Sequence, residues 1–144
     1  MTEPSNKPEV AVGVVVLSGD GRVVLVKRAR PPRVDEWSIP GGRQQWGETI
    51  AECAVREVKE ETGLDAHLVG LIDVVDGIFH DAEGTLSHHY TLVDFVAKAS
   101  GEPRAGDDAG DARWVPLNAI GRYKLWSETQ RIIELAVDRC ARTE

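Results

Sequence analysis

Runs of valine and leucine alternate along the chain with short polar or glycine-rich stretches, a pattern typical of strands joined by tight turns. Two runs near the start, over 10–17 and 22–28, flank the sequence Ser-Gly-Asp-Gly and predict a hairpin. Two longer runs, over 66–79 and 86–99, flank a second turn at Gly84, and Gly77 is expected to form a bulge. Loops are predicted over 31–41 and 100–110, and a short strand over 112–115.

Two other stretches carry apolar residues at helical spacing. The first starts at Thr49, which forms a capping-box pattern with Glu52, and ends before Gly63, which suits the left-handed residue after a last turn. The second starts at Ser127. In the first helix, four apolar residues are predicted to pack against the sheet: Ala51, Ala54, Val55 and Val58. A mixed β-sheet between helices follows, which is an α/β fold of the α/β/α sandwich type.

The first predicted helix also carries three carboxylates, Glu57, Glu60 and Glu61. Their spacing places them on one side of a helix, within an arc of about 100°. Like charges at such positions repel by roughly 0.2–0.5 kcal/mol per pair. A divalent cation would remove this repulsion, because Mg²⁺ prefers oxygen ligands. The alternative is a solvated acidic face without a ligand.

A longer pattern surrounds these carboxylates. From Gly42 to Leu64 the chain reads GRQQWGETIAECAVREVKEETGL, which matches G-x5-E-x7-R-E-U-x-E-E-x-G-U, with U aliphatic, at all nine specified positions. This pattern is that of the Nudix hydrolases, and the preceding WSIPGG resembles the usual approach to it. The resemblance implies the Nudix fold, as a single domain over 8–144 that follows a polar, disordered tail over 1–7.

The composition and net charge of the chain limit the kinds of molecule that it is expected to bind. The chain has 144 residues, which suits one domain with its own core. A formal charge of −7 without a basic stripe argues against an extended nucleic acid, but it allows a phosphate substrate if cations lie between the two. Two cysteines outside any metal or redox spacing favour the cytoplasm. A membrane partner is not expected, because no window approaches the ~20 apolar residues of a membrane span.

The resemblance also assigns roles. Glu57, Glu60 and Glu61 are expected to hold Mg²⁺, with Mn²⁺ as an alternative, and Glu48 to join the metal site or to lie beside it. Arg56 is expected to brace these carboxylates, since a guanidinium can hold two carboxylate oxygens in one plane. An ordinary surface ion pair is the alternative for Glu48 and Arg56.

Three further positions beside the pattern are candidates. Gly41 and Gly42 allow the backbone to approach a metal or a phosphate closely, and the resemblance implies a metal-ligating carbonyl at Gly41. Among the acids before Trp114, Asp108 is the preferred extra ligand or general base. A plain turn is the alternative for the glycines, and a solvated turn for Asp108.

Basic and aromatic side chains near the pattern could contact the substrate. Arg28, at the end of a predicted strand, is the preferred partner for a distal phosphate or a terminal carboxylate. Trp46 could stack on a base, as could the aromatic side chains of Phe79, His88 and Tyr90. Solvated surface is the alternative for Arg28, and core packing is the alternative for the aromatic residues.

The resemblance implies metal-dependent hydrolysis of the pyrophosphate bond in a nucleoside diphosphate linked to another group. ADP-ribose or a nucleotide sugar is narrowly favoured, because the segment 88–96 resembles bacterial members of that group. Phe79 and His80 stand where that group often has a proline, so a (d)NTP or oxidised nucleotide is the alternative, followed by dinucleoside polyphosphates and RNA 5′ ends. A non-catalytic nucleotide sensor is the alternative from another class, and a homodimer is left open.

Overall fold

The computed structural model describes residues 7–31, 33–106 and 109–143. The tail predicted over 1–7 therefore lies outside the described residues, except for Lys7. Asp108, the candidate base, also lies outside them.

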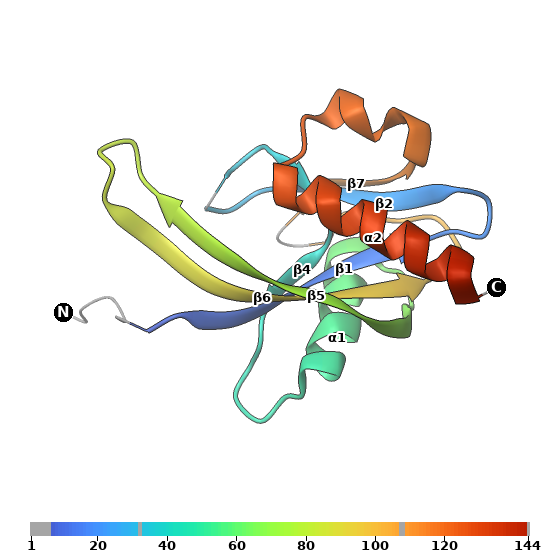
Figure 1. The fold of residues 1–144 in the computed structure, drawn as a ribbon, viewed down its shortest axis with the longest axis horizontal. Helices are drawn as coiled ribbons and strands as arrows, with labels where there is room; N and C mark the ends of the chain where they lie inside the picture. Colours follow the sequence, from blue (N-terminus) through green and yellow to red (C-terminus); the bar gives the residue numbers. More distant parts are fainter. Residues whose placement is uncertain (1–6, 32, 107–108, 144) are drawn as a thin grey trace.

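A mixed sheet forms the centre of the protein (Figure 1). Within the described residues it contains β1 Glu9–Leu17, β2 Arg22–Arg28, β3 Trp37–Ser38, β4 Gly41–Arg43, β5 His67–His80, β6 Leu86–Lys98 and β7 Ala109–Pro116. β1 pairs in parallel with β6, and antiparallel with β2 and β4. β3 and β7 pair with β2, and β5 pairs with β6. The β5–β6 hairpin extends beyond both helices (Figure 1).

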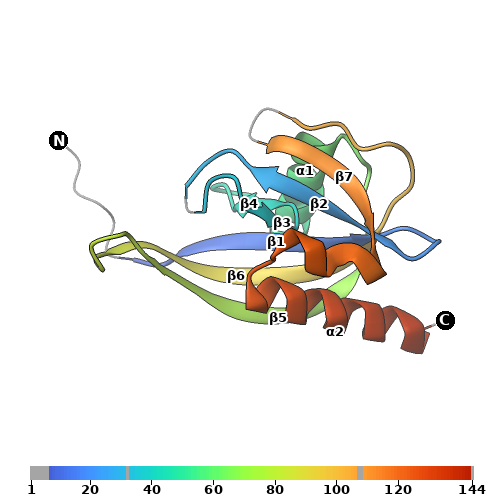
Figure 2. The ribbon, with the colours of Figure 1, turned by 90° about the horizontal axis from the view of Figure 1, so that it is seen from above.

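Helices cover both faces of this sheet (Figure 2). α1, Ile50–Thr62, lies on one face, and α2, Ser127–Thr143, lies on the other. The 3₁₀ helix η1, Leu117–Tyr123, packs into the same apolar cluster as α2. The predicted α/β/α arrangement is therefore confirmed. None of the helices in the described ranges has the length and apolar character needed to cross a membrane.

Local interactions fix the ends of α1 as predicted. Thr49 accepts a hydrogen bond from the Glu52 backbone, and the Glu52 side chain accepts one from the Thr49 backbone, which completes the capping box. Gly63 has φ +74° and donates to the Lys59 carbonyl, so it ends the helix in the left-handed conformation. These two caps fix the first and last residues of the helix that carries Glu57, Glu60 and Glu61.

The loop predicted over 31–41 contains two short strands, and this prediction was incomplete. β4 pairs with β1 through Gly42 opposite Val12, and the Pro40 carbonyl accepts from the Val14 N–H at 2.9 Å. Two- and three-residue strands carry too little alternation to be recognised in a sequence. β3 lies beside β2 and β4 beside β1, and a loop over 44–49 then joins β4 to α1.

Two finer predictions were wrong. Gly77 pairs directly with Tyr90, and the bulges of β5 lie elsewhere, near residues 68–70, 71–73 and 79–80. Ala51 and Val55 are exposed, because the buried side of α1 runs instead through Cys53, Ala54, Val58 and Thr62. The helix therefore faces the sheet with a slightly different side from the one that its apolar pattern indicated.

Candidate active site

The glycine pair of β4 is pressed between β1 and α1. A Cβ atom on Gly41 would lie 2.1 Å from the Val12 carbonyl oxygen. A Cβ atom on Gly42 would lie 2.4 Å from the carboxyl carbon of Glu57. The obstacle at Gly41 is backbone, so only glycine fits there, whereas a side chain at Gly42 would displace the Glu57 carboxylate. The backbone of β4 therefore forms one wall of a site whose other wall is the acidic side of α1.

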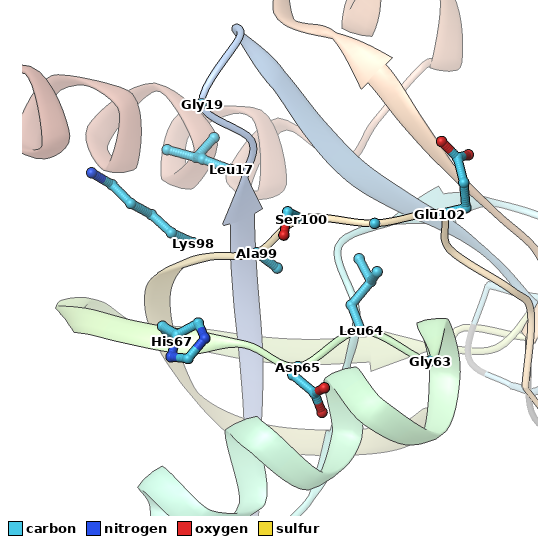
Figure 3. A pocket seen from close by; sticks show the side chains of 11 residues that line it. Leu17, Gly19, Gly63, Leu64, Asp65, His67, Lys98, Ala99, Ser100 and Glu102 are labelled. Atoms are coloured by element: carbon cyan, nitrogen blue, oxygen red, sulfur yellow. The ribbon is translucent and has the colours of Figure 1, made fainter.

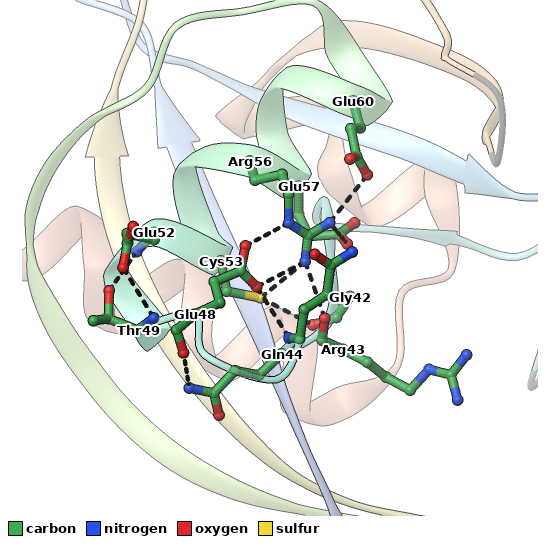
Figure 4. A network of polar contacts seen from close by, with 11 residues as sticks. Gly42, Arg43, Gln44, Glu48, Thr49, Glu52, Cys53, Arg56, Glu57 and Glu60 are labelled. Atoms are coloured by element: carbon green, nitrogen blue, oxygen red, sulfur yellow. Dashed lines mark hydrogen bonds and ion pairs between the residues drawn. The ribbon is translucent and has the colours of Figure 1, made fainter.

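Arg56 contacts several acceptors at once in this site (Figure 4). Its Nε donates to Glu48 at 2.5 Å, and its Nη1 donates to Glu57 at 2.7 Å and to Glu60 at 3.1 Å. Its Nη2 donates to the Arg43 carbonyl at 3.1 Å. The bond from Arg56 lowers the pKa of Glu48 to about 2, and the carboxylates raise the pKa of Arg56 further. The predicted bracing of the carboxylates by Arg56 thus has a specific geometry in the structure.

Glu57 and Glu61 form a pair beside this network. Burial raises the pKa of Glu61 to about 8, with a further rise from the charge of Glu57, while the Gly41 N–H and Arg28 oppose the rise. Burial also raises the pKa of Glu57, and Arg56 opposes that rise. The two carboxyl groups lie near enough for each to affect the pKa of the other.

The donors of this site suit a hard divalent cation. They are carboxylate oxygens, and the raised pKa values of Glu57 and Glu61 indicate two neighbouring negative charges that a bound cation would neutralise. Across the described residues, no three acidic, histidine or cysteine side chains converge on one point. The reason is visible in the contacts, because Arg56 draws Glu48 and Glu60 to itself. Glu57 and Glu61 would be the principal ligands, and Glu48 and Glu60 could join after turning away from Arg56.

Three other residues are candidates from the sequence: Arg28, Trp46 and Asp108. Arg28 ends β2, and its charge opposes the rise in the pKa of Glu61. Trp46 is fully exposed, with 104% relative exposure, on the loop before α1. Asp108 lies outside the described residues, but its neighbour Ala109 is paired with Arg28. Gly106 donates to the Glu61 carbonyl at 3.1 Å.

An aromatic group lies on the other face of the sheet. The rings of Phe79 and Trp126 have centroids 5.4 Å apart, and the guanidinium of Arg33 lies over both rings. Tyr90 lies 6.4 Å from Phe79 and stacks on His88. Sequence reasoning considered Phe79, His88 and Tyr90 but missed Trp126, because nothing in its local pattern indicated that it meets the β5–β6 hairpin.

Asp94 is a buried carboxyl group that sequence reasoning also missed. Its relative exposure is 5%, and burial raises its pKa to about 7, with a further rise from Asp73 and opposition from Arg131. A Cβ atom on Gly13 would lie 2.3 Å from Asp94 Oδ1, so glycine on β1 leaves room for this carboxyl group. An aspartate in the middle of an apolar strand pattern was the available signal.

An open hollow of about 520 Å³ lies beyond the end of α1 (Figure 3). Its charged and titratable side chains are Asp65, His67, Lys98 and Glu102, and they point apart from one another in Figure 3. They do not form a set of ligands around one point. The candidate active site is therefore the carboxylate pair and its surroundings.

The raised pKa values predict how the stability of the metal-free protein depends on pH. Glu61 has an ordinary pKa of about 4.5 and a native pKa of about 8. Between these values the native state holds more protons than the unfolded state, so the free energy of unfolding falls as pH rises. Asp94 acts in the same direction up to about pH 7. Scanning calorimetry with EDTA should show a falling Tm from about pH 5 to pH 8.

Addition of Mg²⁺ should distinguish the effect of Glu61 on the pH dependence of stability from the effect of Asp94. A cation bound by Glu57 and Glu61 should restore the Tm of the wild type above neutral pH, and Glu61→Gln should abolish this restoration. Asp94→Asn should instead flatten the part of the profile that Mg²⁺ does not change. A Tm that stays constant over this range, or an equal Mg²⁺ effect in Glu61→Gln, would contradict the assignment.

Comparison with known proteins agrees with this geometry. The NUDIX domain profile matches residues 7–136. The chain is 35% identical over 127 residues to the ADP-ribose pyrophosphatase of Methanocaldococcus jannaschii, covering 88% of this chain and 72% of that protein. It is 30% identical over 138 residues to the putative mutator protein MutT4 of Mycobacterium tuberculosis, covering 89% of this chain and 54% of that protein.

Solved structures show the same fold. The MutT NUDIX hydrolase from Burkholderia pseudomallei has a TM-score of 0.76 at 31% identity, with 90% of this chain and 98% of that chain covered. The NUDIX domain of Shewanella oneidensis NrtR, crystallised with ADP ribose, has a TM-score of 0.79 at 21% identity, covering 94% and 90%. The chain belongs to the Nudix family, and it is a Nudix hydrolase.

Proposed function

We propose that this Nudix hydrolase uses Mg²⁺, or Mn²⁺, to cleave the pyrophosphate bond of a nucleoside diphosphate linked to another group. The observation that carries the proposal is the Glu57 carboxylate, held between Arg56 and the backbone of Gly42, with Glu61 close beside it. A bound divalent cation would neutralise phosphate charge and lower the pKa of an attacking water. This chemistry explains why an acidic protein can accept an anionic substrate.

Each residue of the site has a separate role in this proposal. Glu57 and Glu61 bind cations, and Glu60 and Glu48 add oxygen ligands when they leave Arg56. Arg56 keeps Glu48 ionised and holds Glu48, Glu57 and Glu60 at a fixed spacing. The N–H of Gly41 orients Glu61, while its carbonyl remains the proposed additional ligand.

Arg28 and Asp108 complete the proposed machinery. Arg28 would bind the phosphate group farther from the nucleoside, since its charge already reaches Glu61. Asp108 is proposed to accept the proton of the attacking water. One O–P bond forms to that water and the bridging P–O bond breaks, which leaves two phosphate monoesters.

ADP-ribose, or a related nucleotide sugar, is the proposed substrate class. The relative from M. jannaschii, at 35% identity, bears the name ADP-ribose pyrophosphatase. A (d)NTP is the second candidate, because relatives named MutT match at similar identity. Trp46, fully exposed in the structure, is proposed as a contact that forms only with a bound ligand.

A substrate panel in ¹⁸O-labelled water tests the proposal. ADP-ribose, a nucleotide sugar, dGTP, 8-oxo-dGTP and a dinucleoside polyphosphate would each be incubated with Mg²⁺ and with Mn²⁺. We expect ADP-ribose to give AMP and ribose 5-phosphate with the highest kcat/KM, and mass spectrometry to locate the label. Preference for a triphosphate would replace the substrate assignment. Tight nucleotide binding without any product would favour the sensor.

We also infer that the domain over 8–144 acts in the cytoplasm. Cys53 and Cys140 belong to apolar clusters on opposite faces of the sheet, so they are placed too far apart to bond to each other. Such buried thiols suit a reducing compartment. Light scattering would show whether the protein forms a homodimer.

A further inference from the structure

The last turn of α1 is completed by a distant segment. The final carbonyl groups of a helix have no partners within it. In α1, the Glu61 carbonyl accepts from the Gly106 N–H at 3.1 Å, and the Thr62 carbonyl accepts from the Arg104 N–H at 2.7 Å. The segment 101–106 therefore supplies the donors that α1 lacks at the turn from which Glu60 and Glu61 project.

Gly106 is seated directly on this turn. A Cβ atom at Gly106 would lie 1.5 Å from the Glu60 carbonyl oxygen and 2.7 Å from its carbon. These are backbone atoms, so a side chain could be accommodated only if the segment or the helix moved. Glycine is required here because two backbones meet, although φ at this position lies outside the left-handed range.

The other end of the segment is held by Trp114 on β7. Its indole Nε1 donates to the Gly101 carbonyl at 2.7 Å, and the guanidinium of Arg22 lies 5.2 Å from the ring centre. Gly101 has φ +105°, a conformation that other residues rarely adopt. The segment is thus tied to the sheet at Gly101 and to α1 at Arg104 and Gly106.

We propose that the segment 101–106 positions Glu60 and Glu61 for cation binding, with Gly106 and Trp114 as its positioning residues. The reason is electrostatic. Without a cation, the carboxylates repel each other and favour opening of the last turn, and the contacts of the segment oppose this opening. Ligands that are already in place lose less conformational freedom on binding, so the segment raises cation affinity. The inference rests on the proposed function.

Two substitutions weaken the segment in different ways. Trp114→Phe keeps an aromatic ring but removes the donor to Gly101, and Gly106→Ala forces the segment away from α1. Gly110→Ala is the matched control, because a Cβ atom there meets nothing closer than 3.8 Å and φ is not in the left-handed range. The full chain is used throughout, and circular dichroism confirms that each variant is folded.

Mn²⁺ binding, measured by the electron paramagnetic resonance of the free ion, is the first readout. We expect binding about fivefold weaker in Trp114→Phe, the effect of one hydrogen bond, and about tenfold weaker or more in Gly106→Ala. Gly110→Ala should bind like the wild type. Unchanged binding in both folded variants, or an equal loss in Gly110→Ala, would overturn the proposal.

Hydrogen exchange of the metal-free protein is the second readout, and it does not depend on catalysis. The amides of residues 61–64 should exchange faster in Trp114→Phe and Gly106→Ala than in Gly110→Ala, while those of 53–56 should not change. Equal protection at 61–64 in all variants would refute the positioning role. If the wild type bound no Mn²⁺, the proposed function would fall, and the exchange data would still decide whether the segment holds the turn.

Discussion

Glu61→Gln is expected to lower turnover of the diphosphate substrate by about a hundredfold or more at saturating Mg²⁺, and Glu57→Gln to do the same. Glutamine keeps the shape of the side chain but cannot supply the negative charge that a cation needs. The fold should be retained in Glu61→Gln, because burial disfavours the charge of Glu61, and in Glu57→Gln the amide oxygen can still accept from Arg56. Steady-state kinetics over a Mg²⁺ series, with Tm measured in parallel, tests this expectation.

Glu52→Gln is the matched control on the same helix. Glu52 lies in the capping box, where glutamine can replace glutamate, and it makes no contact with Arg56 among the interactions described. It should retain normal kinetics. Rates close to the wild type in Glu57→Gln and Glu61→Gln would show that the pair does not bind the catalytic cation.

Arg56→Lys is expected to have the second largest effect, with activity about tenfold lower and stability reduced by about 1–3 kcal/mol. Lysine keeps the charge but cannot bridge Glu48, Glu57 and Glu60 at once, so carboxylates that now share one guanidinium would be left without partners. The pKa of Glu48 should rise toward its ordinary value. Urea unfolding at neutral pH and an NMR titration of Glu48 measure these effects.

Arg43→Lys is a suitable comparison. Arg43 contributes its backbone carbonyl to Arg56, and its side chain pairs with Glu9 at the surface. A change of its side chain should therefore alter stability by well under about 1 kcal/mol. If Arg56→Lys and Arg43→Lys behaved alike, Arg56 would be an ordinary surface cation with no part in spacing the carboxylates.

Sequence reasoning succeeded where structure is determined locally. The ends of α1 were predicted correctly because Thr49, Glu52 and Gly63 act within one turn of the helix. The long strands were predicted because alternation and valine content are local properties. The short strands β3 and β4 were missed, since their pairing depends on Val12 and Val26, which lie elsewhere in the chain.

In the site, too, local spacing could be read from the sequence, whereas contacts with distant residues could not. Helical spacing placed Glu57 and Glu61 on one side of α1, and in the structure the charge of Glu57 raises the pKa of Glu61. The spacing could not show that Arg56 holds Glu60 and Glu48 away from this pair. It also could not show that Gly106 meets the last turn of α1, because this contact crosses more than forty residues of chain. Contacts of this kind are set by the packing of the whole sheet.

A crystal structure with Mn²⁺ and a non-hydrolysable ADP-ribose analogue tests the central claim most directly. Data collected at the manganese absorption edge identify the ion without ambiguity. The account predicts anomalous peaks between the carboxylates of Glu57 and Glu61 and the diphosphate, with Glu60 or Glu48 released from Arg56. A well-ordered analogue without any ion at this pair, and with all three Arg56 ion pairs intact, would contradict it.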